Sequence, residues 1–142
     1  MKQALILKNL GGEVSAAQLE AINRFSRRAL EADEVYVFSL LLCDNAVDRD
    51  GERFSSAALQ KLASLFVGKT GIFNHDPKGQ NQTARIFETA VETDDGRVVE
   101  NGEPYQALRA WAYMVRCPKN EDLILEIDAG IKKEVSVGCA VG

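Results

Sequence analysis

The apolar run at positions 35–43 constrains the fold more than any other feature of the sequence. It reads Val-Tyr-Val-Phe-Ser-Leu-Leu-Leu-Cys, a mixture of β-branched, aromatic and aliphatic side chains that is typical of a buried strand. It is the longest apolar stretch in the chain, yet it is far shorter than the ~18 residues needed to cross a membrane as a helix. The sequence therefore predicts a sheet with 35–43 as a central strand, and it predicts no membrane partner.

Four further segments have strand character. They lie at 70–74, 83–93, 105–116 and 134–141. The second of them alternates regularly, and the third is a long run that Pro118 stops, because proline cannot donate to a strand ladder. The Asp-Asp-Gly sequence at 94–96 predicts a hairpin turn, and Asn101-Gly102 predicts another turn after it.

Three segments have apolar residues at helical spacing. They lie at 15–33, 57–67 and 120–129. Ser15 and Asn120 are suitable N-caps for the first and third helices, and Ser55 or Ser56 is suitable for the second. Gly68 and Gly130 are expected to end the second and third helices. The Gly11-Gly12 pair predicts a joint, so that 1–14 forms a separate arm or an edge strand.

The order of these elements predicts the fold class. Mostly antiparallel strands interrupted by three helices indicate an α+β fold or a β barrel decorated with helices. A chain of 142 residues is long enough for one domain with a substantial core.

Composition excludes several classes of site. The net charge of −4 and the lack of a dense Lys/Arg stripe argue against a nucleic-acid partner. The chain has one histidine, three cysteines and no CxxC pair, so a zinc site is not expected and the cysteines are expected to be reduced thiols. The Asp-rich loop at 44–53 does not have the ligand spacing of a calcium loop. We therefore expect no metal.

One histidine and one serine make the sharpest hypothesis about chemistry. His75 lies in Asn-His-Asp-Pro where a predicted strand gives way to a polar loop, and Ser136 lies in Val-Ser-Val-Gly within the last predicted strand. Imidazole is the side chain best suited to take a proton from serine near neutral pH. A turn histidine and a small strand serine are the structural alternative, because such pairs are recognised by geometry and not by sequence position.

The segment 35–142 resembles the phage prohead proteases, or capsid maturation proteases, a family related in fold to the herpesvirus assemblins. The resemblance rests on the order of the elements and on three short sequences. These are Asn-His-Asp at 74–76, Ala-Arg-Ile at 84–86 and Glu-Val-Ser-Val-Gly at 134–138, which follows a helix and a glycine.

The resemblance implies an antiparallel β barrel flanked by helices, with 35–142 as the protease domain. Residues 1–34 lie outside the matched part and are expected to form an N-terminal arm and helix. Ser136 would be the nucleophile and His75 the general base, with no metal or organic cofactor. The activity implied is endopeptidase cleavage of scaffold segments, of the major capsid protein and of the enzyme itself. It would take place inside the immature prohead in the host bacterial cytoplasm, and the enzyme would form homo-oligomers.

The C-terminus departs from the family pattern. Assemblin-type proteases carry a third catalytic group and part of the oxyanion hole after the serine strand, whereas this chain ends at Gly142, six residues after Ser136. We therefore expect a truncated or processed chain, which could be inactive by itself. An internal acid, Glu88 or Asp122, is the other candidate to orient His75.

Two alternatives to a serine protease stay open at this point. The first is a non-catalytic scaffold or decoration protein of a phage shell that has the same fold. The second is a small metal-dependent or cysteine hydrolase that uses Cys139, although a cysteine in a strand also suits core packing.

Overall fold

The computed structural model describes residues 2–7, 14–46, 54–72, 82–131 and 133–137. These residues form an α+β fold. The strands are β1 (Lys2–Leu7), β2 (Val35–Asp44), β3 (Thr70–Ile72), β4 (Gln82–Val98), β5 (Pro104–Val115) and β6 (Glu134–Val137). The α-helices are α1 (Ala16–Asn23), α2 (Ser56–Phe66) and α3 (Glu121–Asp128), and short 3-10 helices occupy Ala32–Glu34 (η1) and Pro118–Asn120 (η3).

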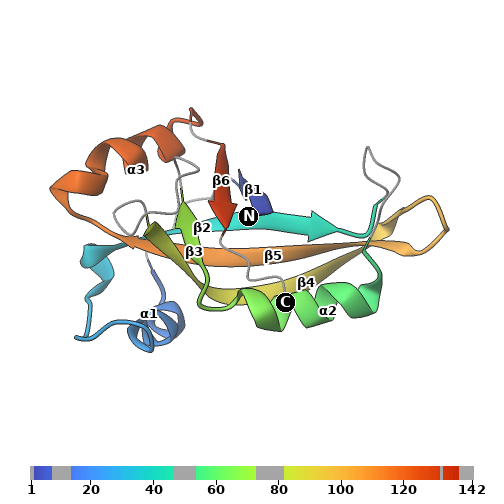
Figure 1. The fold of residues 1–142 in the computed structure, drawn as a ribbon, viewed down its shortest axis with the longest axis horizontal. Helices are drawn as coiled ribbons and strands as arrows, with labels where there is room; N and C mark the ends of the chain where they lie inside the picture. Colours follow the sequence, from blue (N-terminus) through green and yellow to red (C-terminus); the bar gives the residue numbers. More distant parts are fainter. Residues whose placement is uncertain (1, 8–13, 47–53, 73–81, 132, 138–142) are drawn as a thin grey trace.

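Every strand pairing in the described residues is antiparallel. The strands pair in the order β1-β2-β5-β4-β3-β6, and β6 also pairs with β1, so the pairing returns to its first strand. The long strands β2, β5 and β4 lie side by side, α2 runs along β4, and α1 and α3 lie on opposite sides of one end of the molecule (Figure 1). The predicted α+β class with mostly antiparallel strands is confirmed.

Strand β2 is apolar except at Ser39 and Asp44, and its side chains on both faces are largely buried. Its alternate side chains enter two different hydrophobic clusters, as the period of two in a strand requires. The larger cluster includes Tyr36, Phe38, Leu40 and Leu42 from β2 together with Leu59, Phe66, Leu108 and Ile124. The smaller cluster includes Val35 and Val37 together with Ile22, Leu30, Phe87 and Tyr113. The central strand predicted at 35–43 is confirmed.

The second and third predicted helices are also confirmed. In α2, Ser55 is the N-cap, since its hydroxyl accepts a hydrogen bond from the Ala58 N–H at 3.0 Å. Gly130 has a φ of +77° after α3, a conformation that glycine adopts at little cost. Asn120 precedes α3 but does not cap it with its side chain, because its amide instead donates to the Val115 carbonyl at 2.8 Å.

The first predicted helix is much shorter than expected. Ser15 caps it as predicted, but α1 ends at Asn23 and the prediction of a helix through residue 33 is wrong. The Asn23 side chain accepts from the Leu30 N–H at 2.8 Å and donates to the Leu30 carbonyl at 3.2 Å. The Ser26 hydroxyl also donates, to the Arg28 carbonyl at 2.6 Å. Such side-chain bonds compete with helix continuation.

Arg28 lies in the loop after α1. It forms an ion pair with Glu34 at 2.5 Å. The hydrogen bonds from Arg28 and from the Glu31 N–H lower the pKa of the Glu34 carboxyl to about 2. This exposed pair joins the loop after α1 to the start of β2.

The hairpin predicted at 94–96 is also wrong. Strand β4 continues to Val98, and the chain turns at 99–103, where Gly102 has a φ of +85°. The pairing of β4 with β5 shifts register between Asp94 and Val98. The Asp94 carboxylate accepts from the Gly96 N–H at 3.0 Å, so the turn-forming residues make an irregularity within one strand. The turn predicted at Asn101-Gly102 is confirmed.

The N-terminal segment is part of the sheet. β1 pairs with β2 on one side and with β6 on the other, so it is not the edge strand or separate arm that the sequence predicted. The ends of the predicted strands at 70–74 and 134–141, like most of the loop at 44–53, lie outside the described residues. None of the described helices has the length and apolar character to span a membrane.

We expect Leu59→Ala in α2 to lower the free energy of unfolding by about 2–5 kcal/mol, because the side chain is 0% exposed and its loss leaves a cavity. Urea denaturation measures this change. Leu125→Ala is the matched control, since it makes the same change in helix α3 at a side chain that is 67% exposed. Equal losses in the two variants would contradict the described core.

We expect Asn23→Ala to lower the free energy of unfolding by about 1–3 kcal/mol, since it leaves the Leu30 backbone groups without their partner. Trypsin cleavage after Arg27 or Arg28 should become faster in this variant. Asn101→Ala removes one exposed turn bond to the Glu103 N–H and serves as the control. An unchanged cleavage rate in Asn23→Ala would show that the side chain does not hold this loop.

Candidate functional site

The structure describes the backbone position of Ser136 and not that of His75. Ser136 lies in β6, where its Cα is in register with Gln3 of β1 and Ile72 of β3. His75 lies outside the described residues, as does Cys139, the alternative nucleophile. The pairing of Ser136 with His75 therefore stays a prediction.

β6 lies between β1 and β3 and packs closely against β3. Its Val135 side chain is 1% exposed within the main core. A Cβ atom at Gly71 of β3 would lie 3.2 Å from Val135 Cγ2 and 3.4 Å from the Ala84 Cβ. Glycine at position 71 therefore allows β3 to approach both neighbours, a role of glycine in strands that sequence analysis did not identify here.

The strand that leads toward the histidine is thus the direct neighbour of the strand that carries the serine. β3 ends at Ile72, three residues before His75 in the sequence, and Ile72 is the register partner of Ser136. Two segments that are far apart in the chain are brought together here by backbone pairing.

The two acids considered as orienting groups lie on other elements. Glu88 is exposed on β4, in register with Trp111 of β5. Asp122 is exposed in the first turn of α3. Neither residue lies on β3 or β6, so the structure does not choose between them.

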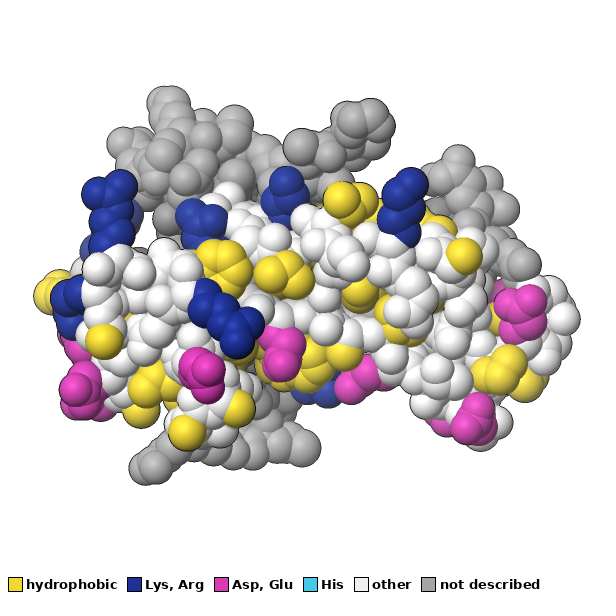
Figure 2. Space-filling view, turned by 90° about the horizontal axis from the view of Figure 1, so that it is seen from below, with side chains coloured by type: hydrophobic (Ala, Val, Ile, Leu, Met, Phe, Trp, Pro, Cys, Tyr) yellow, Lys and Arg dark blue, Asp and Glu magenta, His cyan; other side chains and the backbone are white. Residues whose placement is uncertain are grey.

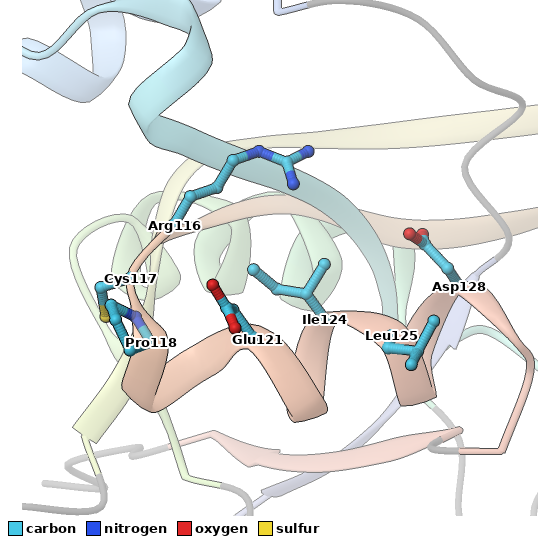
Figure 3. Close-up of a pocket in the computed structure, with 7 residues that line it drawn as sticks. All are labelled: Arg116, Cys117, Pro118, Glu121, Ile124, Leu125 and Asp128. Atoms are coloured by element: carbon cyan, nitrogen blue, oxygen red, sulfur yellow. The ribbon is translucent and has the colours of Figure 1, made fainter.

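Sequence analysis missed a pocket between α3 and the end of β5. Its volume is about 370 Å³, and it is lined by Arg116, Cys117, Pro118, Glu121, Ile124, Leu125 and Asp128. Figure 3 shows Cys117 and Pro118 at one end of the lining and Asp128 at the other. The four helical members recur at the i, i+3, i+4, i+7 spacing of one helix face, and this was the signal available in the sequence.

A polar contact joins this pocket to the central strand. The Tyr36 hydroxyl of β2 donates to Asp128 Oδ1 at 2.6 Å, and the Arg116 guanidinium lies over the Tyr36 ring at 5.3 Å. The Arg116 Nε also donates to the Val35 carbonyl at 3.2 Å. Burial, and then the hydrogen bond to Asp128, raise the pKa of Tyr36 well above its ordinary value.

The other charged groups give no sign of a metal centre in the part of the chain that the structure describes. No three residues among its His, Cys, Asp and Glu come together as a ligand set. On the face seen in Figure 2, Lys and Arg side chains gather toward one long edge, while Asp and Glu lie mainly toward the opposite edge and one end. The described surface on this side therefore carries charges of both signs.

Comparison of the chain with models of protein families, with curated proteins and with solved structures finds no match.

We expect none of the three tyrosines to ionise at the ordinary pKa of about 10 in the folded protein. Burial is the main cause that raises the pKa of Tyr36, Tyr105 and Tyr113, and hydrogen bonds to Asp128 and Asp44 add to it for the first two. The resulting stability is present below pH 10 and is lost as the pH rises through the higher folded values.

Phenolate absorbance during an alkaline titration measures this ionisation. In denaturant all three tyrosines should titrate together near their ordinary pKa, and Tyr36→Phe should remove the fraction that titrates last in the folded protein. Phenolate that forms at the ordinary pKa before the protein unfolds would contradict the described burial.

Proposed function

We propose that this chain is a serine endopeptidase of the prohead maturation type, with Ser136 as the nucleophile and His75 as the general base. The observation that carries the proposal is the register of β6 with β3, in which Ser136 is opposite Ile72. His75 follows Ile72 by three residues, and three residues of fully extended chain span at most about 11 Å. The backbone is therefore compatible with a contact between the two side chains.

The fold supports the same proposal. Six antiparallel strands pair in a cycle, and three helices accompany them. This arrangement is compatible with the barrel flanked by helices that the resemblance to prohead proteases and assemblins implied for 35–142. We propose an assemblin-like barrel on this basis, in which β1 contributes a strand from outside that segment.

The mechanism follows from the chemistry of the two side chains. His75 takes the proton of Ser136 as the serine oxygen attacks a peptide carbonyl, and the protonated imidazole then donates to the leaving amine. Water, activated by the same imidazole, hydrolyses the acyl-enzyme. The group that orients His75 is either an internal acid, Glu88 or Asp122, or a residue in a natural continuation of the chain. No metal or organic cofactor takes part.

The substrates in this proposal are extended segments of scaffold and major capsid protein, and of the enzyme itself. Cleavage takes place inside an immature prohead in the host bacterial cytoplasm, and the enzyme works as a homo-oligomer.

A serine-reactive fluorophosphonate tests the proposal directly. We expect covalent labelling of the chain, its complete loss in Ser136→Ala, and a reduction of about 100-fold or more in His75→Ala. Ser64→Ala, at an exposed serine of α2, is the matched control and should label like the parent chain. Labelling should be insensitive to chelators and should persist in Cys139→Ser.

Labelling that survives Ser136→Ala would overturn the assignment of the nucleophile. A folded chain that takes up no label and cleaves no scaffold or capsid peptide would favour a non-catalytic shell protein with this fold. Loss of labelling in Cys139→Ser, or on addition of a chelator, would instead favour the cysteine or metal-dependent hydrolase.

A further inference from the structure

The hydrogen bond between Tyr36 and Asp128 joins the central strand to the last turn of α3. The Tyr36 residue is 6% exposed, and its ring stacks on Phe38 with the ring centres 6.0 Å apart. The ring is therefore fixed by the core, and its hydroxyl is presented at a defined place. The bond to Asp128 Oδ1, at 2.6 Å, has the short length of a hydrogen bond to a charged acceptor.

Asp128 is an unfavourable residue for its own position in the helix. It is the last residue of α3, and no basic residue accompanies it in that turn. The negative end of the helix dipole disfavours a carboxylate there. The hydrogen bond from Tyr36 is thus a tertiary contact that stabilises the Asp128 carboxylate at a position where the helix dipole opposes it.

The chain between Asp128 and β6 is short and held at several points. The Gly130 N–H donates to the Ile127 carbonyl at 3.1 Å, and the Ile131 N–H donates to the Glu126 carbonyl at 2.9 Å, which is the hydrogen-bond pattern of a Schellman C-cap. The Lys133 carbonyl accepts from the Ile6 N–H of β1 at 2.7 Å. β6 begins at the next residue, Glu134. Only five residues separate Asp128 from Glu134, so the end of α3 and the start of β6 are close together along the chain.

The described pairing of β6 is short. Its described part has four residues, with four register pairs to β1 and two to β3. Short ladders open more readily than long ones. Ser136 follows Asp128 by eight residues in the sequence.

We propose that Tyr36 and Asp128 are positioning residues that hold α3 on the central strand and thereby keep β6, with Ser136, in register between β1 and β3. The catalytic part of this inference rests on the proposed function, whereas the effect on β6 does not. The two parts can therefore be tested separately.

Backbone hydrogen exchange of 134–137 tests the structural part without reference to activity. Tyr36→Phe removes only the hydroxyl and leaves the ring packing in place. We expect it to make exchange in β6 about fivefold to tenfold faster. Tyr105→Phe is the matched control, because it removes a similar bond to Asp44 (2.9 Å) at a position outside the link to α3.

Two variants of Asp128 complete the test and guard against general destabilisation. Asp128 is exposed, so Asp128→Ala should fold, and its β6 exchange should match that of Tyr36→Phe. Asp128→Asn keeps an acceptor oxygen and should restore most of the protection. The double variant Tyr36→Phe/Asp128→Ala should be no faster than either single variant, because both changes remove the same bond.

Equal β6 exchange in Tyr36→Phe and Tyr105→Phe would overturn the proposed link. If the link holds and the parent chain accepts fluorophosphonate, Tyr36→Phe should label about tenfold more slowly in its folded fraction, and Asp128→Asn should recover the rate. Faster exchange in β6 with an unchanged labelling rate would overturn the positioning role alone. A parent chain that takes up no label would count against the proposed function and not against the link.

Discussion

The antiparallel pairing of β2 with β5 is the interaction on which the rest of the structure depends. The ladder runs from Val35 opposite Val115 to Asp44 opposite Ala107, with one irregularity between Leu41 and Cys43. It brings the most apolar segment of the chain against a second long strand, and it presents side chains to two hydrophobic clusters at once. Burial of both faces supplies the hydrophobic stabilisation that holds the helices in place.

Hydrogen bonds at the two ends of the β2–β5 ladder attach the neighbouring segments of the chain to it. At one end of the ladder the Arg116 N–H donates to the Glu34 carbonyl at 2.7 Å. At the other end Asn45, which is buried, accepts from the Gln106 N–H at 2.9 Å and donates to the Pro104 carbonyl at 3.0 Å. The buried side chain of Asn45 is thus satisfied, as is usual for buried polar groups. The hydroxyl of Tyr36 extends this support to α3.

Sequence reasoning worked where one pattern controlled the structure. The run at 35–43 could only be satisfied by burial on both sides, and α2 carried both a serine cap and an apolar face. It failed where polar side chains compete locally. Asn23 ends α1 by binding the Leu30 backbone, which helical periodicity does not report. The Asp-Asp-Gly sequence at 94–96, which is typical of a turn, forms an irregularity inside β4 instead, because β4 pairs with β5 on both sides of it.

The candidate site, like the fold, could be predicted from the sequence only in part. Sequence alone singled out Ser136 and His75 by chemical type, and the pairing of β6 with β3 is a long-range contact that no local pattern contains. Asp128 was an unremarked helix acid until its contact with Tyr36, 92 residues away in the chain, was seen. Residues that act through tertiary contacts can be identified only once the strands are placed.

The position of β6 has a consequence for how the molecule would come apart. In the described residues this strand lies between β1 and β3, so its detachment would leave each of them without a neighbour on one side, while their pairing with β2 and β4 would remain. Each would then present unsatisfied backbone groups to solvent. A strand from another copy could take the vacant place, so departure of this one short segment is the natural route to strand exchange between molecules.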